Sequence, residues 1–484
     1  MMLFKTIITK YIKVRNPNTI TLYNHIKNYF TASLISKGLI LLSLPLFTRI
    51  LKPSEFGNIA LFNSYVALLG IIFGLGIRGA IVRYYYELKS DFSAYFSSAV
   101  SFVFFMASFL SILSILFIEY FAQITNLNTS ILIIIILTSF LSVFYEIFMS
   151  YLEASKQSNL HKKISIYKVL LFLSLSIPIT LCLETNKEYG QISSYFLVSF
   201  CLFIFSAIST RKILKPRLNL VHVKYSIAFG APIIFHLLSQ YILAHFDQLM
   251  INNLIGSKET GLYSLAYQIG MIQTFLTAAV IKAWTPIFYD QLNRHNFRAI
   301  QYNTERNLSI VLSLSLVFVL FSENIISIFA DTRYSQSSKI IPIIICGYVC
   351  HYLYNVYVAY SFYSKKTTIV AIGSIIAGLI NISLNYYLLP IFGYEIAAWT
   401  TLVSYFFLFL INYFFSRYCQ NLQVVSFKFL LPYIMLFLCF VIFKHLITVN
   451  ISLVITRILL NIICISCYIL ITRKLLKEKE SYGY

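Results

Sequence analysis

The chain has 484 residues, of which 59% are hydrophobic and only 11% are charged. Soluble domains carry roughly 25% charged residues, so these charges are too few to cover a water-exposed surface of this size. The net charge of +21 does not indicate nucleic-acid binding, because Lys and Arg lie in short polar gaps between apolar segments and form no basic stripe with interleaved aromatics. The composition therefore indicates an integral membrane protein.

The N-terminal segment is basic and lacks the apolar core of a cleavable signal peptide. Its cations are Lys5, Lys10, Lys13, Arg15 and Lys27. We predict that residues 1–30 form a cytoplasmic segment that precedes the first membrane helix.

Long apolar segments follow one another along the rest of the chain. A bilayer core about 30 Å thick needs roughly 20 apolar residues per helix, because each backbone amide must be paired within its own segment. The sequence predicts an all-α, polytopic membrane protein with about 14 transmembrane helices. The predicted spans are 31–51, 56–78, 95–119, 129–151, 165–183, 190–209, 227–250, 260–283, 307–329, 340–362, 367–389, 394–416, 428–445 and 451–472.

The orientation of these helices follows from the cations in the gaps between them. Lys and Arg are retained on the cytoplasmic side of a membrane, and alternate gaps of this chain are rich and poor in them. Both chain ends are therefore predicted to be cytoplasmic. The gaps on the opposite side are too short to hold an extracytoplasmic domain with an active site.

An internal repeat relates two segments of the chain. Residues 51–61 read LKPSEFGNIAL and residues 255–265 read IGSKETGLYSL, so that Glu55 aligns with Glu259 and Gly57 with Gly261. At the same shift Arg78 aligns with Lys282, which predicts a cation at the end of the second helix of each half. An even number of helices separates the copies, so the halves are predicted to be parallel repeats about an axis along the membrane normal.

The repeat divides the chain into two halves. We predict an N-lobe of helices 1–6 over residues 31–224 and a C-lobe of helices 7–12 over residues 225–416. Helices 13 and 14 then occupy residues 417–472, and residues 473–484 form a cytoplasmic tail.

Several motifs that would indicate cofactor or metal chemistry are absent or lie in the wrong context. Gly74, Gly76 and Gly79 satisfy G-x-G-x-x-G, but they lie within a predicted membrane helix, where small residues allow close helix packing. The sequence contains no P-loop and no H-E-x-x-H, and the Cys464-x-x-Cys467 pair has no second pair of ligands. We predict no metal, no cofactor and no catalytic residues.

Ionisable residues within or next to the predicted helices are the candidate site residues, because a charge in hydrocarbon normally faces a cavity or a partner. The cations are candidates for lining a substrate cavity, and the carboxylates are candidates for ion coupling. Each has a simpler alternative as an interfacial residue, since a long cationic side chain can reach the membrane surface. The cavity candidates are Lys37, Arg49, Arg78, Arg83 and Lys282, and the ion-coupling candidates are Glu146 and Asp247.

Two segments resemble a known family. FTRILKPSEFGNIALFNSYVALLGIIFGLGIRGAIVRYYYE, residues 47–87, and FDQLMINNLIGSKETGLYSLAYQIG, residues 246–270, resemble the two signatures of the Wzx-type O-antigen translocases, which are polysaccharide-export flippases. The resemblance implies the multidrug/oligosaccharidyl-lipid/polysaccharide exporter fold, with two six-helix lobes around a cavity and two further helices. It also implies an undecaprenyl-pyrophosphate-linked oligosaccharide as substrate, which alternating access passes across the membrane.

These observations lead to a predicted function with two alternatives. The prediction is a non-enzymatic flippase in the bacterial cytoplasmic (inner) membrane that serves O-antigen, lipopolysaccharide or other surface polysaccharide synthesis. Its expected partners are the lipid-linked oligosaccharide, membrane lipids and the polysaccharide polymerase machinery. The alternatives are a polysaccharide polymerase or membrane glycosyltransferase, and a small-molecule antiporter similar to the multidrug exporters.

Overall fold

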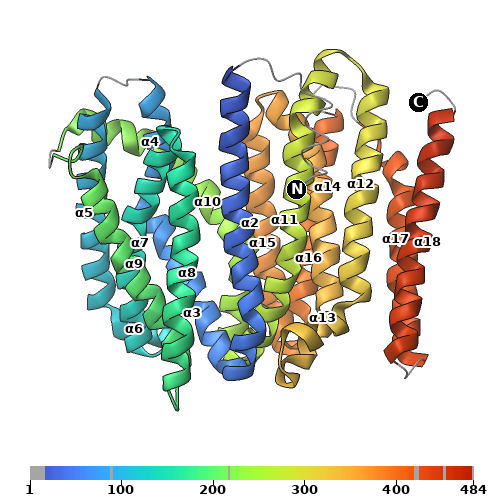
Figure 1. Cartoon of the computed structure of the whole chain (residues 1–484), viewed down its shortest axis with the longest axis horizontal. Helices are drawn as coiled ribbons and strands as arrows, with labels where there is room; N and C mark the ends of the chain where they lie inside the picture. Colours follow the sequence, from blue (N-terminus) through green and yellow to red (C-terminus); the bar gives the residue numbers. More distant parts are fainter. Residues whose placement is uncertain (1–16, 88–90, 216–217, 419–424, 451–453, 482–484) are drawn as a thin grey trace. The chain divides into compact units, whose positions relative to one another are not determined.

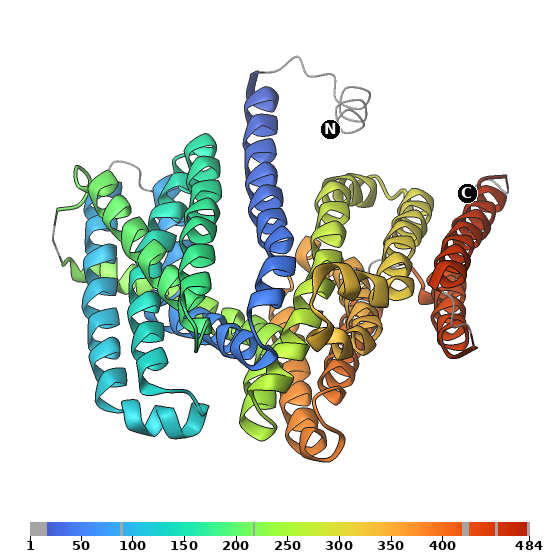
Figure 2. The same ribbon diagram turned by 60° about the horizontal axis from the view of Figure 1, so that its bottom comes forward.

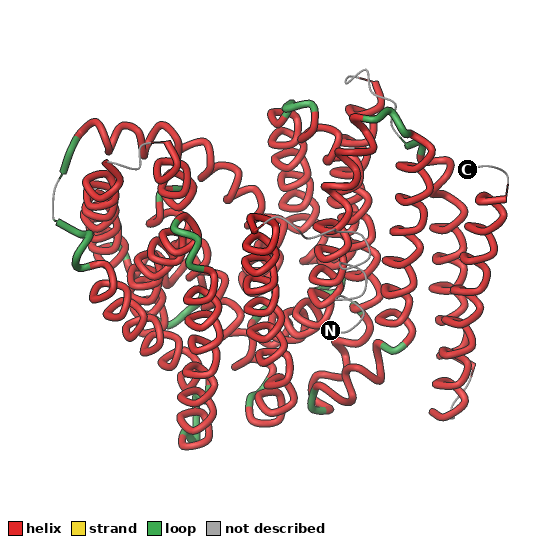
Figure 3. Tube along the Cα trace, turned by 45° about the horizontal axis from the view of Figure 1, so that its top comes forward, coloured by secondary structure: helices red, strands yellow, loops and turns green. Residues whose placement is uncertain are grey.

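The structure, a computed structural model, describes residues 17–87, 91–215, 218–418, 425–450 and 454–481. These residues form helices and no strands (Figure 3). Within them, 13 helices are long and apolar enough to cross a membrane, and a bent pair supplies a further span if it is counted as one. The predicted all-α, polytopic fold with about 14 spans is confirmed. The predictions for Lys5, Lys10, Lys13 and Arg15 lie outside the described residues.

The chain forms two compact units, and the first consists of Met1–Ile50 and Tyr65–Leu237. Its helix α7 is the most buried span and packs against α4, α5, α8 and α9 (Figure 1). The short helix α6, cyan in Figure 2, lies across the ends of α5 and α7. The helices of this unit are α2 (Pro17–Ile50), the second part of α3 (Pro53–Gly74), α4 (Ile77–Glu87), α5 (Phe92–Leu116), α6 (Ile118–Thr125), α7 (Thr129–Ala154), α8 (Ser158–Cys182), α9 (Glu188–Thr210) and the first part of α10 (Leu220–Leu254).

A break separates α3 from α4. Leu75 and Gly76 both have positive φ angles, 49° and 65°, which end the helix at Gly74. A Cβ on Gly76 would lie 2.5 Å from the carbonyl oxygen of Gly230, so only glycine allows this approach to α10. The predicted single helix over residues 56–78 is therefore wrong at its end, because an apolar, glycine-rich sequence does not reveal where its backbone turns. Arg78 consequently begins a second helix.

The second unit consists of Leu51–Ser64 and Leu238–Tyr484. Its helix α14 is the most buried span and packs against α11, α12 and α16. The elements of this unit are the first part of α3, the second part of α10, α11 (Ser257–Asn293), α12 (Phe297–Leu320), α13 (Ser322–Phe329), the 3-10 helix η2 (Thr332–Lys339), α14 (Ile341–Tyr363), α15 (Thr367–Phe392), α16 (Ile396–Tyr418), α17 (Phe427–Asn450) and α18 (Val454–Ser481).

The two last helices, α17 and α18, attach to the bent span of α12 and α13. The bend between α12 and α13 is 64°. A bend frees backbone groups that lipid cannot satisfy, so neighbouring helices must supply partners. The Asn461 amide donates to the carbonyl oxygen of Leu320 at 2.9 Å, and Lys444 donates to the Ser322 hydroxyl at 2.6 Å.

The repeat copies occupy equivalent places in two helices. Glu55 lies in the first turn of α3 and Glu259 in the first turn of α11, where a carboxylate favours the positive end of the helix dipole. Leu61 and Leu265 are both fully buried. The predicted pairing of Arg78 with Lys282 at helix ends is wrong, because Arg78 follows the α3–α4 break whereas Lys282 lies inside the continuous helix α11.

The described residues near the chain ends are more helical than the sequence predicts. Helix α2 begins at Pro17, within the predicted segment 1–30, and α18 continues to Ser481, through most of the predicted tail 473–484. The lobe boundaries at residues 224 and 416 and the cytoplasmic location of both ends stay predictions.

Candidate functional site

Two predicted site residues of the first unit, Arg78 and Glu146, form an ion pair. Arg78 extends from the first turn of α4, and its Nη1 lies 2.9 Å from Oε2 of Glu146 on α7. Its Nε donates to the hydroxyl of Ser150 at 3.2 Å, and that hydroxyl donates to the carbonyl oxygen of Glu146 at 3.0 Å. One turn of α7 thus holds the guanidinium at two of its nitrogens.

The ion pair lies on the accessible side of an otherwise buried helix. Within residues 143–150 of α7, every residue but Glu146 is buried. The Glu146 side chain is 38% exposed and that of Arg78 is 52% exposed. A charged pair in a membrane span normally faces a partner or a polar cavity, since charge in hydrocarbon is costly. The pair is therefore open to a ligand from outside the unit's core.

A third charged residue, Lys168 of α8, contacts Tyr145, the residue of α7 that precedes Glu146. Its Nζ is 4.5 Å from the centre of the buried Tyr145 ring, a cation–π contact. We name Arg78, Tyr145, Glu146, Ser150 and Lys168 the α7 charge cluster.

Lys168 was not among the residues predicted for the site. It lies near a cation-rich gap between two predicted spans, where Lys and Arg are common in any membrane protein. Its position inside the predicted span 165–183 was the signal that could have identified it.

The other predicted cations lie elsewhere in their units. Lys37 of α2 and Arg49 at the end of α2 are exposed, and each interacts with another residue. Lys282 is exposed on α11. Arg83 forms an ion pair with Glu87 and lies 5.0 Å from the ring centre of Phe229.

The Arg83 pair belongs to α4, which is not among the helices long enough to span a membrane. Tyr225 donates to Glu87 at 2.7 Å. This hydrogen bond and the Arg83 guanidinium hold the pKa of the Glu87 carboxyl below its usual value, because both stabilise the charged form. Arg83 is thus paired within its own helix, four residues away, whereas Arg78 pairs with a residue of another helix.

The second predicted carboxylate, Asp247, lies in a buried polar cluster of the second unit. Asp247 of α10 is 3% exposed. Tyr263 of α11 donates to its Oδ2 at 2.6 Å, and Thr401 of α16 donates to the same oxygen at 2.5 Å. Asn385 of α15 donates to Oδ1 at 2.6 Å and accepts from Thr400 at 2.5 Å. Four helices therefore meet at one carboxylate.

The partners of Asp247 are all neutral. Among the ion pairs of the described residues, none involves Asp247. The hydrogen bonds from Tyr263, Thr401 and Asn385 stabilise the carboxylate, and a bound proton or cation would neutralise its charge. The hydroxyl oxygens of Tyr263 and Thr401 are hard ligands of the kind that small, hard cations prefer, whereas Asn385 presents its amide nitrogen to Asp247.

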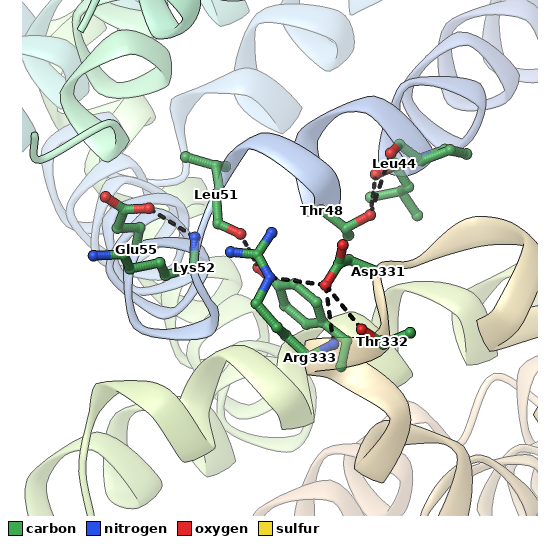
Figure 4. A network of polar contacts seen from close by, with 10 residues as sticks. Leu44, Thr48, Leu51, Lys52, Glu55, Asp331, Thr332 and Arg333 are labelled. Atoms are coloured by element: carbon green, nitrogen blue, oxygen red, sulfur yellow. Dashed lines mark hydrogen bonds and ion pairs between the residues drawn. The ribbon is translucent and has the colours of Figure 1, made fainter. Parts of the chain in front are cut away.

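The start of α3 is held by the loop that contains η2 (Figure 4). The hydroxyl of Tyr334 donates to the carbonyl oxygen of Leu51 at 3.1 Å, and the Lys52 amide donates to Glu55 at 2.7 Å. In the same loop, Arg333 donates to Asp331 through its backbone and its side chain, which lowers the pKa of the Asp331 carboxyl. These bonds position the first turn of α3 within the second unit.

An all-α bundle of about 14 spans with charged groups paired inside it is a polytopic membrane protein. The sequence profile of the polysaccharide biosynthesis protein family matches residues 25–291, more than half of the chain. The chain therefore belongs to this family. The profile of the MatE family also matches, over residues 232–387.

Two relatives from Haemophilus influenzae cover most of the chain. An uncharacterized membrane protein is 21% identical over 73% of this chain and 86% of its own length. A protein described as Lsg locus putative protein 1 is 20% identical over 73% of this chain and 88% of its own length. The similarity therefore extends well beyond the two signature segments.

Solved structures share the fold. The lipid II flippase MurJ in an inward closed conformation has a TM-score of 0.71 at 15% identity, and the match covers 92% of this chain and 98% of MurJ. An inward-facing multidrug resistance MATE transporter of the MOP superfamily has a TM-score of 0.59 at 12% identity, covering 80% and 94% of the two chains. The predicted MOP exporter fold is confirmed.

Proposed function

We propose that this protein is a flippase that moves an undecaprenyl-pyrophosphate-linked oligosaccharide across the bacterial cytoplasmic membrane for surface polysaccharide synthesis. Membership of the polysaccharide biosynthesis protein family supports the pathway. The fold shared with a lipid II flippase supports movement of a lipid-linked substrate between the two leaflets. One fold can serve several substrates, so the choice of substrate must be argued from the site.

The observation that carries the proposal is the α7 charge cluster. A pyrophosphate head group that crosses a low-dielectric layer needs cations along its path. Arg78 of α4 and Lys168 of α8 contact consecutive residues of α7, Glu146 and Tyr145, and Arg78 is half-exposed. A cluster of this kind suits an anionic head group better than a neutral or cationic drug.

The surroundings of Asp247 support an ion gradient as the energy source of transport. A carboxylate buried among neutral polar groups provides a place for a proton or a small cation, whose gradient would drive the cycle. We assign Arg78 and Lys168 to substrate binding and Asp247 to ion coupling. Lys37 stays a candidate for the cavity.

The deciding experiment compares the location of lipid-linked repeat units in cells that lack this gene. For a flippase, the units accumulate in the inner leaflet and surface polymer is lost. Loss of a polymerase or glycosyltransferase instead leaves single units exposed outside or prevents their synthesis, and loss of a drug antiporter changes neither. An export defect with units accessible from outside would contradict the proposal.

The same assay tests the assigned residues. Arg78→Gln should reduce surface polysaccharide by roughly tenfold or more at unchanged protein level, the size expected when one charged contact to a phosphate is lost. Arg294→Gln is the matched control, because Arg294 directly follows the last residue of α11 and forms an exposed ion pair with Asp290 of that helix. Full export by the Arg78 variant would remove it from the substrate path.

A further inference from the structure

The charge cluster on α7 contains one group that an anion-binding site does not need. Arg78 and Lys168 are cations, but the Glu146 carboxylate forms an ion pair with the Arg78 guanidinium at 2.9 Å. A carboxylate at this position repels a phosphate and competes with it for the same donors. Its presence therefore requires an explanation beyond substrate binding.

The geometry points to a resident counter-anion: we propose that Glu146 occupies Arg78 in the empty transporter and is displaced when a phosphoryl group of the substrate binds Arg78 and Lys168. The inference rests on the proposed function, since it concerns an anionic head group at that site. It adds a role for Glu146 that is opposite to that of a substrate ligand.

The ion pair has the accessibility that displacement requires. Both side chains are partly exposed, so solvent screens their attraction and the pair is weak compared with a buried one. A pyrophosphate carries more charge than a carboxylate and offers several oxygens in a geometry that suits a guanidinium. It can therefore replace Glu146 at Arg78.

The surroundings keep Arg78 in place when Glu146 leaves. The Ser150 hydroxyl accepts from Nε of Arg78, while Glu146 contacts Nη1, so the second contact does not depend on the first. The break at Leu75 and Gly76, packed against Gly230, fixes the start of α4. Arg78 thus has a fixed direction and an exchangeable partner.

Exchange has a consequence for release. If Arg78 were unpaired in the empty state, a charge in the membrane would be left without a partner, and the substrate anion would be held tightly. Glu146 returns to Arg78 as the substrate departs, which lowers the affinity and favours release. Glu146 is therefore a specificity and release residue, and neutralising it should increase affinity while it slows export.

The test measures binding of inorganic pyrophosphate to the purified full-length protein in lipid nanodiscs. Wild-type protein should bind, and Glu146→Gln should bind roughly twofold to fivefold more tightly, the step that loss of one partly exposed competing charge produces. Arg78→Gln and Lys168→Gln should each bind roughly tenfold more weakly. Asp290→Asn removes a carboxylate from an exposed Arg pair elsewhere and should leave affinity unchanged.

A double variant separates competition from a general structural effect. When Arg78 is already Gln, Glu146→Gln should no longer tighten binding, because the two residues act through one contact. Export by Glu146→Gln in cells should fall although its affinity rises.

The outcomes distinguish the inference from the proposed function. Wild-type binding with equal or weaker binding by Glu146→Gln would overturn the counter-anion and leave the flippase proposal intact. Equal tightening by Asp290→Asn would also overturn it, because net charge would then be the cause. Absence of pyrophosphate binding by folded wild-type protein would overturn the substrate class and the inference together.

Discussion

Gly57 and Gly261 pack backbone against backbone at the first turns of α3 and α11. A Cβ on Gly57 would overlap the carbonyl oxygen of Ser257, and a Cβ on Gly261 would overlap that of Pro53. Pro53 and Ser257 are equivalent in the internal repeat, as are the two glycines. The contact is therefore reciprocal, which is the pattern that a twofold axis produces. The repeat found in the sequence corresponds to a symmetric helix contact within the second unit.

This contact should be sensitive to a single methyl group. Gly57→Ala or Gly261→Ala must separate the two helices, because the overlapping atoms belong to the backbone, and we expect a loss of about 2 kcal/mol in the free energy of unfolding. Thermal unfolding in detergent measures it. Gly70→Ala is the matched control, since nothing lies within 4 Å of its added Cβ on the same helix α3. Equal midpoints for all three variants would contradict the contact.

The spans could be predicted because they depend on local hydropathy, whereas their interruptions could not. The segment from Gly70 to Ile77 is apolar and rich in glycine throughout, and only the packing of Gly76 on Gly230 shows where the backbone turns. The same limit applies to the bend between Leu320 and Ser322. Its partners, Lys444 and Asn461, follow more than a hundred residues later.

That bend provides a test of how the last two helices attach. Asn461→Leu removes the donor to the Leu320 carbonyl, which is left buried without its partner, and we expect a cost of about 1–2 kcal/mol. Cys464 is buried on the same helix α18, and Cys467 is exposed. The labelling rate of Cys464 by a thiol reagent, measured by mass spectrometry, should therefore rise in the variant while that of Cys467 stays unchanged.

A control on the exposed face of α18 is Ile462→Leu, because Ile462 is 49% exposed. This variant should label as the wild type does. If Cys464 in Asn461→Leu also labels at the wild-type rate, the hydrogen bond does not hold α18 against α12.

The charged residues of the candidate site could be predicted from the sequence, but the residues that they contact could not. Charges in spans are rare, so Arg78, Glu146 and Asp247 could be identified from their positions alone. Their distances could not, because the contacts join helices that the sequence separates by dozens of residues. Asn385 and Thr401 gave no signal, since neutral polar residues are common in membrane helices and acquire meaning only beside Asp247.

The cluster around Asp247 predicts a dependence on a cation. A ligand that binds only the folded state raises the free energy of unfolding, by about 2.7 kcal/mol at a concentration 100 times its dissociation constant. The unfolding midpoint of the wild type should therefore rise with Na⁺ concentration or with proton concentration. Asp247→Asn should remove that dependence, keep the hydrogen bonds to neighbouring hydroxyls and reduce export by roughly tenfold or more.

Asp290→Asn, an exposed carboxylate paired with Arg294, is the control and should keep both the cation dependence and export. The unfolding midpoint is measured in two series, one with Na⁺ varied at constant pH and one with pH varied at constant Na⁺, which shows whether Na⁺ or the proton is bound. A binding role for Asp247 requires that the cation response disappear together with export, because one carboxylate would serve both. Loss of export with an unchanged cation response would assign Asp247 to the packing of the four helices that meet there.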